Sequence, residues 1–121
     1  MLVNSFYTIL HSTLVDNTIR ASIRINRQHP IFTGHFPDVP VVPGVCMIQL
    51  VKEITEIQES EAFTLVAGDN IKFLSVLNPD QHPEVEVVID LERNNNLAVT
   101  ATVLAGEVTF LKLKAVLEKR T

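Results

Sequence analysis

PGVCMIQLVKEITEIQE, residues 43–59, is the stretch that decides the fold. Proline followed by glycine suits the opening turn of a helix. Apolar residues then recur at helical spacing, at Val45, Ile48, Val51, Ile54 and Ile57. The first turns are apolar on nearly every side, which is typical of a helix that is buried all round. Charged residues follow, so we expect the helix to emerge toward solvent at Lys52, Glu53, Glu56 and Glu59.

Segments of strand-like character surround this helix. Two strands are predicted before it, over residues 7–11 and 18–25, joined by a turn at 15–17. Five runs after it also read as strands, over residues 62–67, 70–77, 85–91, 97–105 and 108–117. Several of them alternate apolar and polar residues, which fits an antiparallel sheet with one wet face. The predicted fold class is α+β, a single domain over residues 1–121 with about six or seven strands curled around one helix.

The composition of the chain indicates where the protein is located and which classes of partner are not expected. The net charge is −4 and the ten Lys and Arg residues are scattered, so no basic stripe indicates nucleic-acid binding. No window approaches the roughly 18 apolar residues of a membrane span, and no export signal is expected. The single cysteine, Cys46, cannot form an internal disulfide. We therefore expect a cytoplasmic protein with no cofactor and no metal site.

A proline-rich loop with one central histidine precedes the helix. The run HPIFTGHFPDVPVVPGV, residues 29–45, resembles the signature loop of the 3-hydroxyacyl-[acyl-carrier-protein] dehydratases of fatty acid biosynthesis, roughly PFFxGHFPxxPxxPGV. The segment LVAGDNIKF, residues 65–73, is also similar to that family. The resemblance implies the hot-dog fold, in which a sheet wraps one helix and dimers are the rule. It further implies an acyl substrate bound to acyl carrier protein or coenzyme A.

The resemblance also assigns roles to particular residues. In that family the loop histidine is the catalytic base, and a carboxylate on the central helix of the other subunit is the partner acid. These positions correspond to His35 and Gln49. Imidazole titrates near the working pH, and backbone N–H groups of Gly44 and Val45 at the helix start suit a developing oxyanion. Apolar residues nearby would line a slot for the acyl chain at the dimer interface, namely Phe32, Phe36, Val45, Met47 and Ile48.

Gln49 departs from the family pattern, because a neutral amide can donate a hydrogen bond but cannot deliver a proton. One interpretation is that His35 both takes and returns the proton while Gln49 orients the hydroxyl or a water. A second is that Glu53 or Asp38 supplies the acid, although a solvated surface role is expected for Glu53. A third is that the protein is a hot-dog thioesterase, or a weak subunit paired with a complete dehydratase. A buried amide with a purely structural role is the alternative for Gln49.

A second copy of the chain and an acidic carrier protein are the expected partners. One sheet face leaves part of an apolar helix uncovered, so a symmetric dimer is expected. A dimer of dimers, or a heterodimer with a related dehydratase, is the other possibility. Acyl carrier proteins are strongly acidic, so a docking surface should be locally basic. The candidates for that surface are Arg24, Arg27, Lys72 and Arg93.

Overall fold

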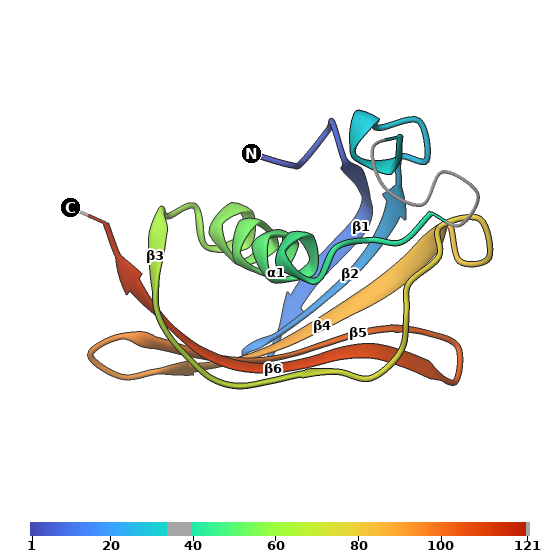
Figure 1. Cartoon of the computed structure of the whole chain (residues 1–121). Helices are drawn as coiled ribbons and strands as arrows, with labels where there is room; N and C mark the ends of the chain where they lie inside the picture. The colour runs from blue at the N-terminus through green and yellow to red at the C-terminus, as the bar shows by residue number, and fades with distance from the viewer. Residues whose placement is uncertain (34–39, 121) are drawn as a thin grey trace.

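One antiparallel sheet wraps around one helix in the computed structural model, which describes residues 1–33 and 40–120 (Figure 1). The six strands lie in the order β1-β2-β4-β5-β6-β3. In chain order the elements are β1 (Tyr7–Val15), β2 (Thr18–Ile25), the 3₁₀ turn η1 (Pro30–Phe32), α1 (Gly44–Glu59), β3 (Phe63–Phe73), β4 (Glu84–Arg93), β5 (Leu97–Ala105) and β6 (Val108–Lys119). The predicted α+β architecture is confirmed. His35, Phe36 and Asp38 lie outside the described residues.

Tight turns set the register of the hairpins. Asp16 and Asn17 join β1 to β2 with φ angles of 51° and 63°. Two successive residues in the left-handed region match the twist of a two-residue hairpin, and Asp and Asn tolerate that region better than most side chains. Gly106, at φ 58°, turns the chain between β5 and β6. The first hairpin therefore continues to Val15, beyond the predicted end of the strand at residue 11.

β3 is one strand where two were predicted. It stays paired with β6 along its whole length, with irregularities between Leu65 and Ala67 and between Gly68 and Asn70. Such bulges absorb extra residues without ending the pairing. The prediction of separate strands over 62–67 and 70–77 is therefore wrong, and the sheet formed by the described residues has six strands.

The buried face of α1 differs from the predicted stripe. Its buried apolar residues are Cys46, Met47, Leu50, Val51 and Ile54. Val45 is 71% exposed and Ile57 is 47% exposed, so neither belongs to the core. Steps of three residues fall short of the 3.6-residue turn, so five such positions travel around a helix and cannot share one face. The helix ends where Ser60 adopts a left-handed conformation and donates back to the carbonyls of Glu56 and Ile57.

No helix among residues 1–33 and 40–120 is both long and apolar enough to cross a membrane.

Candidate functional site

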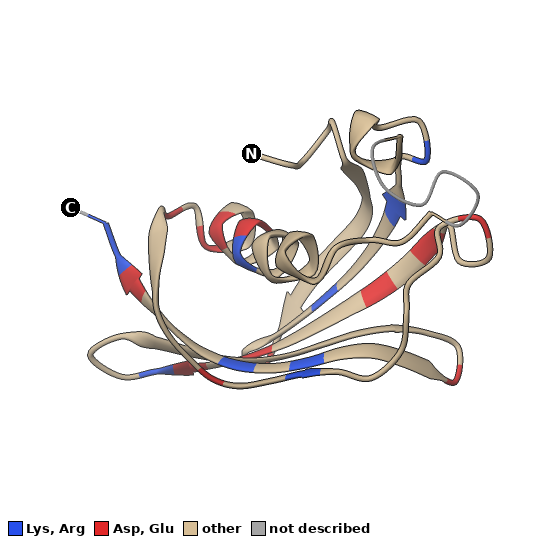
Figure 2. Cartoon of the chain, in the orientation of Figure 1, with Lys and Arg blue, Asp and Glu red and all other residues tan. Residues whose placement is uncertain are grey.

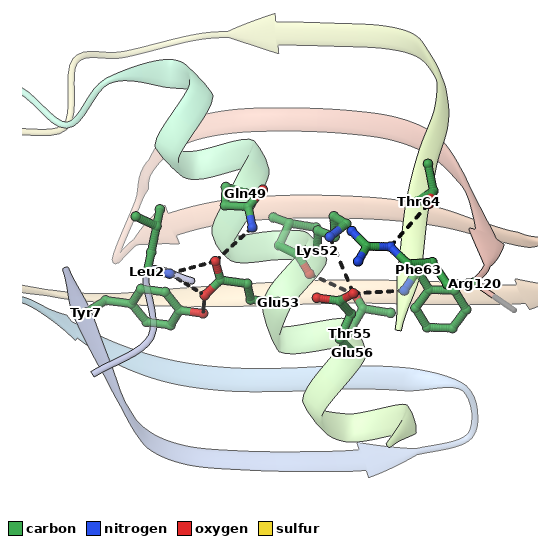
Figure 3. A network of polar contacts seen from close by, with 11 residues as sticks. Leu2, Tyr7, Gln49, Lys52, Glu53, Thr55, Glu56, Phe63, Thr64 and Arg120 are labelled. Atoms are coloured by element: carbon green, nitrogen blue, oxygen red, sulfur yellow. Dashed lines mark hydrogen bonds and ion pairs between the residues drawn. The ribbon is translucent and has the colours of Figure 1, made fainter. Parts of the chain in front are cut away.

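Glu53 lies inside the protein, which corrects the prediction that it is a solvated glutamate. Its side chain is 0% exposed. The backbone N–H groups of Leu2 and Val3 donate to its two carboxylate oxygens, each at 2.8 Å. Figure 3 shows the contact with Leu2. The Tyr7 hydroxyl donates at 3.1 Å and the Gln49 amide at 2.8 Å. The N-terminal segment and β1 thus supply the donors that a carboxylate needs when it leaves water.

These contacts determine the protonation states of Glu53 and Tyr7. Burial raises the pKa of the Glu53 carboxyl, but the hydrogen bonds from Leu2, Gln49, Val3 and Tyr7 outweigh burial and lower that pKa below its ordinary value. Burial, and then the negative charge of Glu53, raise the pKa of the Tyr7 phenol. Glu53 is therefore a carboxylate that accepts hydrogen bonds from each of these donors. The interpretation in which Glu53 replaces the missing acid does not fit, because a carboxylate has no proton to give.

The carboxylate of Glu53 also determines how the amide of Gln49 is turned. A carboxylate only accepts hydrogen bonds, so Gln49 must direct its Nε2 toward Glu53. Its carbonyl oxygen Oε1 then points away from Glu53, as Figure 3 shows. Gln49 is half-buried and sits one turn before Glu53 on the same side of α1. The side chain consequently presents an acceptor, and not mainly a donor, to whatever binds beside it.

Gln49 borders two hollows. One is an open groove of about 570 Å³ along the outer side of α1, lined by Met1, Gln49, Lys52, Glu56, Ile57, Ser60, Glu61, Ala62 and Arg120. The other is an apolar cavity of about 170 Å³ between α1 and the sheet, lined by Ile48, Gln49, Val51, Lys52, Leu65, Val99, Leu113, Ala115 and Leu117. Among the residues that the structure describes, only Gln49 and Lys52 line both hollows. A polar end group at Gln49 and an apolar tail in the cavity would suit one elongated ligand.

The residues predicted to line the acyl slot lie in different surroundings in the single chain. Ile48 lines the apolar cavity, whereas Phe32 does not. Phe32 is buried in the core, where its ring stacks on that of Phe6 at 5.6 Å between centroids. Val45 points to solvent and Met47 is buried among core residues, so neither lines that cavity.

Gly44 opens α1 in close contact with β3. A Cβ atom at this position would lie 2.5 Å from Cε1 of Phe73, so the aromatic ring occupies the space that a side chain would need. The space beside Gly44 is therefore occupied by Phe73, which is itself 54% exposed. Pro43 provides no side-chain cap for the helix. The helix start thus keeps backbone N–H groups and a positive dipole end beside an aromatic ring.

Lys52 and Glu56 form the wall of the groove on the side of β3. The Lys52 ammonium pairs with Glu56 at 3.4 Å, and Glu56 accepts from the backbone N–H of Phe63 at 2.8 Å (Figure 3). Arg120 approaches the Thr64 hydroxyl at 3.4 Å from the other side. These contacts tie α1 to the start of β3 and shape the groove that leads to Gln49.

The family model for ApeI-like proteins, described as ApeI dehydratase, matches residues 11–109. A curated relative is the 3-hydroxyacyl-[acyl-carrier-protein] dehydratase FabZ of Rickettsia massiliae, which is 36% identical over 91 residues. The match covers 67% of this chain and 62% of that relative, so it spans less than two thirds of the relative's length.

Two solved structures share the fold at low identity. The dehydratase heterocomplex ApeI:P from Xenorhabdus doucetiae gives a TM-score of 0.71 at 18% identity, covering 91% of this chain and 96% of that chain. A hypothetical thioesterase with coenzyme A from Streptococcus pneumoniae gives 0.66 at 9% identity, covering 94% and 85%. These likenesses confirm the predicted hot-dog fold.

Proposed function

The chain belongs to the ApeI-like dehydratase family, and from this premise we propose that it converts 3-hydroxyacyl thioesters into trans-2-enoyl thioesters and water. The observation that supports this most is the position of Gln49, which borders both the groove and the apolar cavity. The resemblance places the family's helix carboxylate at the same position. We propose an acyl carrier protein as the carrier of the substrate, as in the name of the FabZ relative.

The reaction needs a base for the proton alpha to the thioester carbonyl, a proton for the leaving hydroxyl, and donors for the carbonyl oxygen. We assign the first two tasks to His35. Its imidazole takes the alpha proton and returns it to the 3-hydroxyl while the C–O bond breaks. Water leaves, and the electron pair of the former C–H bond forms the new double bond. Backbone N–H groups of Gly44 and Val45 hold the carbonyl oxygen as negative charge develops on it.

Gln49 has an orienting role in this scheme. Because Glu53 holds Nε2, the free Oε1 accepts the hydrogen of the substrate's 3-hydroxyl and turns the hydroxyl oxygen toward the proton donor. The acyl tail lies in the apolar cavity behind Gln49, against Ile48 and the inner face of β5 and β6. The amide therefore selects a substrate that carries a hydroxyl group at C3, and leaves the proton transfer to His35.

A second copy of the chain completes the site in this proposal. β3 lies at one edge of the sheet and leaves apolar side chains exposed on it and just after it, at Leu65, Val66, Ile71, Phe73, Leu74 and Val76. An edge strand with exposed apolar residues is prone to pair with another chain. The resemblance implies that His35 of one copy works with Gln49 of the other.

Sedimentation of the purified protein should give the mass of two copies, and an active monomer would contradict this assignment.

The test of the proposed function is the identity of the product. A 3-hydroxyacyl group on acyl carrier protein is incubated with the purified protein, and the carrier is weighed by mass spectrometry. Dehydration lowers the mass of the carrier by one water and leaves the thioester intact. Release of free carrier and 3-hydroxy acid would instead identify a thioesterase. If the mass of the 3-hydroxyacyl carrier does not change and no free carrier is released, the proposal is refuted. The chain would then be a subunit that needs a complete dehydratase beside it.

A further inference from the structure

We propose that an acidic carrier protein docks on the outer face of the sheet at Lys72, Lys112 and Lys114, hereafter the lysine cluster. The inference rests on the proposed function, because that function requires a carrier-bound substrate. It names the surface that recognises the carrier, which neither the family match nor the site geometry specifies.

The lysine cluster is formed by two adjacent strands. Lys72 of β3 is the direct cross-strand partner of Lys112 of β6, and Lys114 follows two residues later on the same face. The alternate residues Leu111 and Leu113 are buried, so the lysines project away from α1. Figure 2 shows the basic segments of β3 and β6 lying together. With Asn70, Thr100, Ala101, Thr102 and Leu113, the three lysines line a shallow hollow of about 220 Å³.

The lysine cluster is positively charged, whereas the whole chain carries a net negative charge. The chain carries a net charge of −4, yet no carboxylate lines the hollow among the residues described. The five ion pairs found within residues 1–33 and 40–120 include none of the three lysines. Like charges directly opposite each other on neighbouring strands destabilise a sheet. A partner with clustered carboxylates relieves that repulsion and gains charge complementarity.

The other basic residues expected to contact a carrier are neutralised within the chain. Arg24 pairs with Glu84 at 3.0 Å, and Arg27 pairs with Asp80 at 2.9 Å. Arg93 binds the carboxylate of Glu59 through two guanidinium nitrogens, and this contact raises its pKa. Of the four predicted candidates, only Lys72 has no carboxylate partner among the described residues. The register of β3 and β6 adds the other two lysines to it.

The cluster also lies close to the start of the helix. Phe73 follows Lys72 and is the last residue of β3. Successive strand residues point to opposite faces, and the Phe73 ring contacts Gly44 on the inner side. A prosthetic arm from a carrier docked on the cluster therefore reaches the helix start around the end of one strand, without crossing the sheet.

The experiment compares two triple variants that remove the same charge. One carries Lys72→Gln, Lys112→Gln and Lys114→Gln, and the other carries Arg24→Gln, Arg27→Gln and Arg93→Gln. Binding of a fluorescently labelled, phosphopantetheinylated acyl carrier protein is measured by anisotropy at low and high salt. Dehydration of a 3-hydroxyacyl N-acetylcysteamine thioester, which has no carrier and no phosphate, is measured in parallel.

The lysine variant should bind the carrier about tenfold or more weakly at low salt, with a smaller salt dependence than the native protein. Its turnover of the small thioester should equal that of the native protein, and the arginine variant should bind the carrier normally. Unchanged binding by the lysine variant, or equal losses in both variants, would overturn the docking surface. Loss of small-thioester turnover in the lysine variant would also overturn it. Absence of small-thioester turnover in the native protein would refute the proposed function instead, while the anisotropy measurement would still test the surface.

Discussion

Replacement of His35 by alanine is expected to lower kcat for dehydration by about 10² to 10⁴-fold, since a positioned general base contributes about that much. In the proposed mechanism the imidazole takes the alpha proton and also returns it, because Gln49 cannot protonate the leaving hydroxyl. No second group then compensates for its loss. Formation of the enoyl thioester is followed by mass spectrometry, and thermal unfolding shows that the variant is folded.

His11→Ala is the matched control for this variant. His11 is an exposed residue of β1, so the substitution removes an imidazole without disturbing the core. It should leave both kcat and the unfolding temperature unchanged. If His35→Ala keeps the native kcat, or if His11→Ala loses as much kcat as His35→Ala, then His35 is not the base.

Glu53→Gln is expected to lower the free energy of unfolding by about 2 to 4 kcal/mol, because it disturbs several charge-assisted hydrogen bonds in a buried place. The glutamine can keep one acceptor oxygen, but its NH₂ group faces N–H donors that the second carboxylate oxygen now satisfies. Tyr7→Phe removes only one donor and leaves the carboxylate bound by the others, so a loss of about 1 kcal/mol is expected. Denaturant titration at neutral pH measures both variants. A Glu53→Gln variant as stable as the native protein would contradict the buried network.

Glu53 also makes the stability of the folded protein depend on pH, and the direction of this dependence can be stated. The pKa of Glu53 is lower in the folded protein than in the unfolded chain. Its contribution to stability is therefore complete above the ordinary carboxyl pKa of about 4.3 and is lost as the pH falls through the folded-state value. The native protein should lose stability more steeply in acid than Glu53→Gln, which has no proton to take up at this position. Parallel curves for the two proteins would contradict the lowered pKa.

Much of the fold could be predicted from the sequence because it rests on local patterns. The Pro-Gly start and the apolar run identified α1, and alternation identified β2, β4, β5 and β6. β3 was divided in two because bulges interrupt its alternation while the pairing with β6 continues. The breaks in the pattern were read as the end of a strand, which only the partner strand can decide.

The site was less predictable because its contacts join distant parts of the chain. Glu53 resembles a surface residue in the helical pattern, yet its donors Leu2, Val3 and Tyr7 come from the first residues of the chain. One signal for this burial was available. Gln49 and Glu53 are polar residues four apart in the sequence, a spacing at which helical side chains meet. The lysine cluster was hidden for a similar reason, since the register that pairs Lys72 with Lys112 is not visible in either strand alone.

The pH dependence of kcat/KM for dehydration shows whether His35 is the one titrating group of the reaction and whether Gln49 orients the substrate without donating a proton. The native protein is expected to show a single rise as the base loses its proton, followed by a plateau. Gln49→Glu should convert that profile into a bell, because its carboxyl must be protonated to act as an acid. A bell-shaped profile for the native protein, with activity falling as a carboxyl loses its proton, would show that an acid serves the reaction after all and would contradict the account.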